Sequence, residues 1–142
     1  MFNFIISKLF VISIILFQFL IAQGSVMLVG GGGENYGSWS DGPYSWFVEK
    51  AGNGKIINID VDEASEWYPD YFISLGANST SHNLQIATVQ SANNPFIYQE
   101  LLSADGIFIE GGDQWDYIST WKNTLVQTAI ENVYNNGGVI GG

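Results

Sequence analysis

Two glycines followed by an acid and an amide, Gly111-Gly112-Asp113-Gln114, form one segment of this sequence that could do chemistry. They come directly after a short apolar run, and open parallel sheets bind their ligands at the carboxyl ends of such strands. Because paired glycines let a backbone N–H point into a crevice, this turn could stabilise an oxyanion. Gln114 could hold a substrate amide or carboxylate, although such a sequence taken alone is more often only a turn.

A run of four glycines, Gly30 to Gly33, ends in Glu34 and follows another apolar run. Glycine permits a sharp turn and a close approach of backbone to ligand, so we expect Gly31, Gly32 and Gly33 to form a pocket loop. The spacing fits neither the dinucleotide-binding pattern nor the Walker pattern. Asp60 stands about where a ribose-binding acid would, so a nucleotide site stays open as a weak alternative to a simple tight turn.

The last segment, Gly137 to Gly142, surrounds the apolar pair Val139-Ile140 with glycines. In α/β hydrolases the nucleophile stands on a strained elbow between a strand and a helix, where only small neighbours fit. The strand and the small residues of such an elbow are present, and the elbow itself is missing. A final strand with no helix behind it is unusual for this architecture, so we expect the N-terminal portion of a longer domain, cut off after about five strands.

Four carboxylates, those of Asp60, Asp62, Glu63 and Glu66, cluster after the second apolar run. Their oxygens could hold a divalent cation, but the spacing fits no calcium loop and a solvated loop is the favoured interpretation. The one histidine, His82, precedes another apolar run, and we interpret it as a surface or strand-edge residue. We therefore predict no metal site and no cofactor.

The elements that must position these segments alternate between short apolar runs and longer stretches of helical period. Almost continuously apolar runs are typical of parallel strands buried on both faces. The repeated order of strand, helix and strand predicts an α/β fold, a flavodoxin-like three-layer sandwich with a mainly parallel sheet and right-handed crossovers. We expect strands at Ser25–Val29, Lys55–Ile59, Asn83–Ala87, Gly106–Ile109 and Gly138–Ile140, and helices at Pro43–Lys50, Ser65–Leu75, Pro95–Leu102 and Thr120–Asn135.

The first 24 residues have the layout of a cleavable secretory signal. Lys8 precedes the apolar run Leu9–Ala22, and small or polar residues follow it. This run is shorter than the roughly 20 residues that cross a bilayer, although a run counted from Phe2 would be long enough for a retained anchor. We therefore divide the chain into a signal peptide, residues 1–24, and one domain, residues 25–142. The protein is expected in the periplasm, at the cell surface or outside the cell.

Composition narrows the possible partners. The chain has no cysteine, which excludes a disulfide framework and a lipid-modified N-terminal cysteine. Its formal net charge is −10, and so acidic a surface repels nucleic acid and anionic lipid headgroups. We expect no nucleic-acid partner and no stable membrane insertion after the signal is cleaved. The acidity could favour a cationic substrate, but solubility outside the cytoplasm is the simpler explanation.

Four stretches together resemble the cyanophycinase and dipeptidase E family of serine exopeptidases, which share the class I glutamine amidotransferase-like fold. They are GSVMLVGGGGE (24–34), YFISLGA (71–77), ADGIFIEGGDQ (104–114) and YNNGGVIGG (134–142). The most specific part is Gly-Gly-Asp-Gln, followed about two dozen residues later by a Gly-Gly-Val-Ile strand. In the family this strand runs into Thr-Ser-Ala-Gly, whose serine is the nucleophile, whereas this sequence ends at Gly142.

The resemblance implies an exported serine-type exopeptidase that hydrolyses short or isopeptide-like peptides through an acyl-enzyme. Carried over by position, it makes the backbone of Gly112 and Asp113 the oxyanion hole and Gly111 and Gln114 substrate-binding residues. The nucleophile is expected just after Gly142, so the chain as it stands should be inactive. The alternative is a non-catalytic exported protein that binds a ligand on the same fold.

Overall fold

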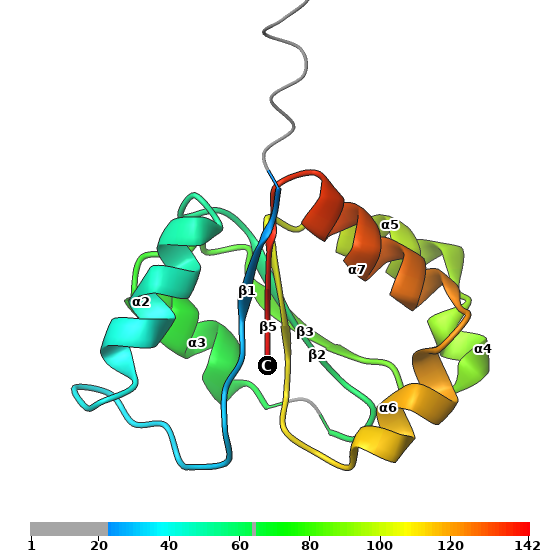
Figure 1. Ribbon diagram of the computed structural model, residues 1–142, viewed down its shortest axis with the longest axis horizontal. Coiled ribbons are helices and arrows are strands. Elements are labelled where there is room, and N and C mark those ends of the chain that lie inside the picture. The colour runs from blue at the N-terminus through cyan, green and yellow to red at the C-terminus, as the bar shows by residue number, and fades with distance from the viewer. Residues whose placement is uncertain (1–22, 64) are drawn as a thin grey trace, which may run out of the picture.

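The computed structural model describes residues 23–63 and 65–142, which form one parallel sheet between two layers of helices (Figure 1). The predicted signal peptide falls almost wholly on residues 1–22, outside the described residues. The sheet has five parallel strands in the order β1-β5-β4-β2-β3. The predicted three-layer α/β fold is therefore confirmed. The strands are β1 (Ser25–Met27), β2 (Ile56–Asp60), β3 (His82–Gln85), β4 (Gly106–Ile109) and β5 (Val139–Gly141).

The helices divide between the two faces of the sheet. Figure 1 shows α2 (Asp41–Lys50) and α3 (Trp67–Ser74) on one face. The other face carries α4 (Val89–Ala92), α5 (Pro95–Leu102), α6 (Gln114–Trp121) and α7 (Leu125–Asn135). The chain moves outward from β2 to β3 and then back across the sheet to β4 and β5. Because the crossovers are right-handed, connections that run in opposite directions across the sheet place their helices on opposite faces, as observed.

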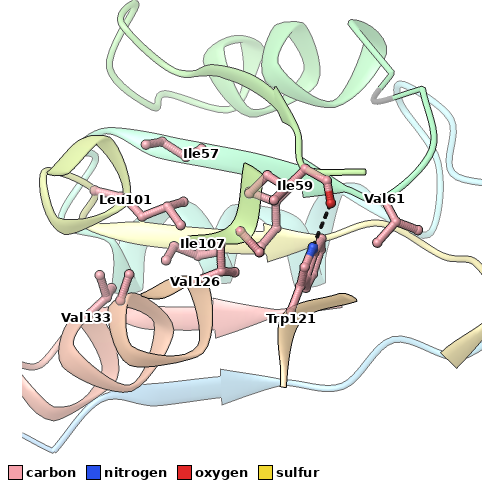
Figure 2. Packing of buried hydrophobic residues seen from close by; sticks show 12 residues of the cluster. Ile57, Ile59, Val61, Leu101, Ile107, Trp121, Val126 and Val133 are labelled. Atoms are coloured by element: carbon pink, nitrogen blue, oxygen red, sulfur yellow. Dashed lines mark hydrogen bonds between the residues drawn. The ribbon is translucent and has the colours of Figure 1, made fainter. Parts of the chain in front are cut away.

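Side chains of alternate residues along a strand pack into two separate hydrophobic cores, one on each face of the sheet. Ile57 and Ile59 of β2 belong to the core beneath α4–α7, whereas Ile56 belongs to the core beneath α2 and α3. Figure 2 shows the first of these cores, in which the ring of Trp121 packs among aliphatic side chains. Its indole Nε1 donates a hydrogen bond to the carbonyl oxygen of Ile86 at 2.8 Å, so the buried polar atom of this residue is satisfied.

The second core is built from aromatic rings around Phe108. The ring centroids of Tyr44, Phe47, Tyr68 and Phe72 lie 5.1–5.8 Å from that of Phe108. In β5, which pairs with β4, the residue beside Phe108 is Gly141. A Cβ at Gly141 would lie 2.7 Å from the Phe47 ring and 3.1 Å from the Phe108 ring, so this packing requires glycine.

The helices differ from the sequence prediction between Gln114 and Asn135. The predicted helix Thr120–Asn135 is wrong, because α6 ends at Trp121 and α7 begins at Leu125. Asn123 between them has a positive φ of 62°, which an α-helix does not permit. Sequence analysis also missed α6, whose N-cap is Asp113, and the one-turn helix α4.

No helix of residues 23–63 or 65–142 is long and apolar enough to cross a membrane.

Candidate functional site

The carboxyl ends of the strands form an edge at which loops leave for opposite faces of the sheet. The loop after β2 leads to α3 on one face, and the loop after the adjacent strand β4 leads to α6 on the other. A crevice opens where neighbouring loops diverge in this way, and it is the usual ligand site of open α/β sheets. The segments singled out in the sequence after β1, β4 and β5 all lie at this edge.

The turn Gly111–Gln114 lies at the crevice with its residues exposed. The Asp113 carboxylate accepts a hydrogen bond from the backbone N–H of Trp115 at 2.8 Å, which caps α6 and fixes the turn. A Cβ at Gly112 would lie 2.9 Å from the Tyr117 hydroxyl, so the Tyr117 side chain packs closely against this glycine. The positions Gly111, Gly112 and Gln114 line a hollow of about 430 Å³, together with residues of β1 and β5.

The end of β5 lies beside this turn. Gly142 donates to the carbonyl oxygen of Met27 at 3.2 Å and accepts from the N–H of Val29 at 2.8 Å, which ties it to β1. Gly142 lines the same 430 Å³ hollow as Gly111 and Gly112. The fold therefore brings together the two segments that carry the most specific part of the family resemblance.

The glycine loop after β1 forms part of a second, smaller hollow of about 140 Å³ at the same edge. Gly30, Gly31 and Gly32 line this hollow, as do Gly111 and Gly142. Gly33 does not line it, and its carbonyl oxygen instead accepts a hydrogen bond from Trp39 Nε1 at 3.3 Å. Two of the three predicted pocket-loop residues are therefore wall residues of a hollow, and Gly30 is a third wall residue that was not predicted.

A carboxylate held by two tyrosines forms another wall of the small hollow. Glu34 Oε1 accepts a hydrogen bond from the Tyr44 hydroxyl at 2.7 Å, and Oε2 accepts from the Tyr68 hydroxyl at 3.3 Å. Burial, reinforced by the charge of Glu34, raises the pKa of both tyrosines well above the ordinary value, so both hydroxyls keep their protons. Sequence analysis placed Glu34 beside the glycine loop but gave no signal for Tyr44 or Tyr68, which come from α2 and α3.

Two further carboxylates lie between β2 and β4. The Tyr117 hydroxyl of α6 lies 3.0 Å from Asp60 Oδ1 and 2.9 Å from the carbonyl oxygen of Glu110, so its single proton is shared between these two acceptors. The Glu110 carboxylate accepts from the Asn58 side-chain amide and from the N–H of Ser65. Burial raises the pKa of Glu110, although both of these hydrogen bonds act in the opposite direction.

The acids considered as cation ligands do not gather around one point. Asp60 is buried, whereas Asp62, Glu63 and Glu66 are exposed. Within residues 23–63 and 65–142 no group of three or more histidine, cysteine or acidic side chains is arranged to hold a metal ion. His82 lies on the edge strand β3 at its amino end, where its Nδ1 is 3.0 Å from the carbonyl oxygen of Thr80. This position agrees with the strand-edge interpretation.

The two hollows offer binding and charge stabilisation rather than a nucleophile. Their walls contain glycine backbone, carboxylates and aromatic rings, and among the described residues that line them there is no serine, cysteine, histidine or lysine. Backbone N–H groups of the glycine turns are suited to an oxyanion, and Glu34 and Glu110 are suited to a cation or a proton. A third hollow of about 340 Å³ lies at the amino ends of the strands, opposite the crevice.

Comparisons with known proteins identify a related fold. No protein-family model matches the chain, and no curated protein does either. Among solved structures, the crystal structure of a peptidase from an acI-B1 Actinobacterium superposes with a TM-score of 0.64 at 22% sequence identity. The alignment covers 84% of this chain and 53% of that peptidase, so the chain spans about half its length. The likeness at this identity establishes that the two proteins share the three-layer α/β fold.

Proposed function

We propose that this chain is the N-terminal portion of an exported serine-type exopeptidase of the cyanophycinase and dipeptidase E kind. The observation that carries the proposal is the position of Gly142, which lines one hollow together with Gly111 and Gly112. A residue that follows Gly142 emerges beside the Gly111–Asp113 turn. A nucleophile there would be next to backbone N–H groups that can stabilise the oxyanion of an acyl-transfer reaction.

The residues of this chain bind the substrate and stabilise charge in the proposed reaction. A serine after Gly142 attacks the substrate carbonyl carbon, and its proton passes to a histidine further along the chain. The oxyanion that forms accepts hydrogen bonds from the backbone of Gly112 and Asp113. Collapse of this intermediate breaks the C–N bond, the histidine returns the proton to the leaving amine, and water then hydrolyses the acyl-enzyme. Gln114 contacts the substrate from the wall of the larger hollow.

An uncovered part of the sheet supports the proposal that more of the domain packs here. β1 is an edge strand, in which Val26 is 53% exposed, and Leu28 directly after it is 89% exposed. Val26 stands beside Ile140 of β5, and both residues line the larger hollow with Leu28. Parallel sheets are normally covered on both faces, so apolar side chains in this position favour a further covering element. The alignment reaches only 53% of the peptidase of the same fold, in agreement with this interpretation.

Reading the source DNA beyond the codon for Gly142, and expressing the protein it encodes, tests the proposal. We expect a serine within a few residues, flanked by small residues, and covalent labelling of that serine by a fluorophosphonate detected by mass spectrometry. Replacing the serine by alanine should abolish labelling and peptide hydrolysis. A stop codon, or a bulky or proline-containing continuation, would overturn the peptidase proposal and favour the ligand-binding protein on the same fold.

Export is a separate part of the proposal. The N–H of Gly24 donates to the carbonyl oxygen of Tyr134 at 3.0 Å, and Gln23 Nε2 donates to the Tyr134 hydroxyl at 3.0 Å. A Cβ at Gly24 would lie 2.4 Å from that carbonyl oxygen, so Gly24 packs tightly against the end of α7. These contacts place Gln23 and Gly24 in the folded domain, so we propose that cleavage occurs no later than the bond before Gln23, two residues earlier than the boundary predicted from the sequence. N-terminal sequencing of secreted protein tests this position, and an intact residue 1 on the secreted product would contradict it.

A further inference from the structure

The small hollow at the carboxyl ends of β1, β4 and β5 has walls of three chemical kinds. The glycine loop and Gly111 supply bare backbone, Glu34 supplies a carboxylate, and Tyr68 supplies an aromatic ring. The volume of about 140 Å³ is far below the roughly 300–1,000 Å³ of sites for drug-sized ligands. The hollow therefore suits one small group of a larger substrate.

The Glu34 carboxylate is held in place but not neutralised. Hydrogen bonds from the hydroxyls of Tyr44 and Tyr68 fix both of its oxygens. Two carboxylate oxygens together offer about four acceptor positions, so two positions are left for a ligand. In the part of the chain that the structure describes, the ion pairs within 4.0 Å join Glu100 to Lys55 and His82, and none involves Glu34. A positive group from the substrate would supply the missing counter-ion.

The aromatic wall favours the same kind of group. Tyr68 lines the hollow beside Glu34, and its ring is held by the buried ring of Phe108, whose centroid lies 5.1 Å away. The face of an aromatic ring attracts a cation electrostatically, and the attraction increases as water is excluded. A compact primary ammonium fits a small hollow that offers one carboxylate and the ring of Tyr68.

We propose that Glu34 and Tyr68 form a subsite that binds a primary ammonium group of the substrate. The subsite shares its walls Gly111 and Gly142 with the larger hollow, where the proposed nucleophile and oxyanion donors meet. An ammonium anchored here stands close to the carbonyl group under attack, as the α-ammonium of an N-terminal residue does. This assignment rests on the proposed peptidase function, and it makes a free amino terminus the feature that the site selects.

Binding measurements on the full chain test the subsite without any catalytic step. Glycinamide would be titrated into ¹⁵N-labelled protein, with N-acetylglycinamide as the neutral counterpart and the amide of N-acetyl-lysine as a source of a side-chain ammonium. We expect glycinamide to shift the amide signals of Gly30, Gly31, Gly32 and Gly111, and N-acetylglycinamide to bind at least tenfold more weakly. Binding of the lysine derivative in place of glycinamide would assign the subsite to a side-chain ammonium and overturn the selection of amino termini.

The variant Glu34→Gln removes the charge and keeps an oxygen that can accept from a tyrosine, so the fold should persist. We expect it to bind glycinamide at least tenfold more weakly than the parent protein. Glu66→Gln is the matched control, because it removes one nearby exposed charge from a residue that lines neither hollow, and its affinity should stay within twofold. Equal losses in the two variants, or no glycinamide binding by the parent, would overturn the proposal.

The subsite and the peptidase proposal can fail separately. Selective glycinamide binding together with a stop codon after Gly142 would leave an ammonium-binding site on a protein that is not a peptidase. An intact protein that hydrolyses N-acetylated and free peptides equally well would be a peptidase whose selectivity does not depend on Glu34.

Discussion

Replacing Phe108 by alanine tests the aromatic core that supports the candidate site. Phe108 is 2% exposed, and four aromatic rings lie with their centroids within 6 Å of its own. Truncation of a buried phenylalanine to alanine costs about 3–5 kcal/mol, and aromatic pairs contribute about 0.5–1.5 kcal/mol beyond their buried area. We therefore expect the free energy of unfolding to fall by about 4 kcal/mol, a large fraction of the roughly 5–15 kcal/mol of a typical domain.

Urea denaturation followed by far-UV circular dichroism measures this loss. With a slope of about 2 kcal/mol per molar urea, a loss of about 4 kcal/mol moves the midpoint down by about 2 M. Phe96→Ala is the matched control, because Phe96 on α5 is 86% exposed and its truncation should change stability by less than about 0.5 kcal/mol. Similar midpoints for the two variants would refute the packing described around Phe108.

Three further perturbations test other parts of the structure. Gly141→Ala should lower the free energy of unfolding by about 1–3 kcal/mol through overpacking, whereas Gly42→Ala in α2, with open space around it, should leave the urea midpoint unchanged or slightly higher. Tyr117→Phe removes the hydroxyl that donates to Asp60 and should cost about 1–3 kcal/mol in the same assay; an unchanged midpoint would contradict a hydrogen-bonding role for that hydroxyl. Burial, followed by its hydrogen bond to Asp41, raises the pKa of Tyr71 from 10.0 to about 12, so the stability that this tyrosine contributes is complete below pH 10 and is lost as the pH rises through 12. Absorbance at 295 nm should therefore show late tyrosine ionisation that coincides with loss of the circular dichroism signal, and full ionisation near pH 10 with the fold intact would contradict this.

The sequence predicted the sheet more accurately than the helices. A strand buried on both faces is mostly apolar, so runs such as Gly106–Ile109 and Ile56–Ile59, in which Asn58 is the one polar residue, mark strands directly. The helix Pro95–Leu102 was also predicted at its observed bounds, because proline marks its first residue. The break at Asn123 was missed, because the apolar residues before and after it follow a single helical period. The left-handed backbone conformation of Asn123, which separates the two helices, leaves no mark in that pattern.

The glycine turns of the candidate site were predicted from the sequence, but the tyrosines that contact its carboxylates were not. Glycine turns after apolar runs are visible in one sequence, so Gly31, Gly32, Gly111 and Gly112 could be singled out, and the structure places all four on the walls of hollows. Tyr68 and Tyr117 gave no signal, because each lies on a helix remote in sequence from the acid that it contacts. Tyr68 is 34 residues from Glu34, and Tyr117 is 57 residues from Asp60.

The sequence alone determined the class of fold and the edge of the sheet at which the candidate site lies, because burial on two faces and the glycines that follow the strands are local properties of the chain. Only the tertiary structure decided which segments meet at that edge. Crossovers of opposite direction bring the loops after β1, β4 and β5 together, so Glu34 faces the same hollow as Gly111 and Gly142. The charge, the aromatic wall and the size of that hollow arise from residues that are far apart in the chain, and packing of α2, α3 and α6 against the sheet fixes their positions.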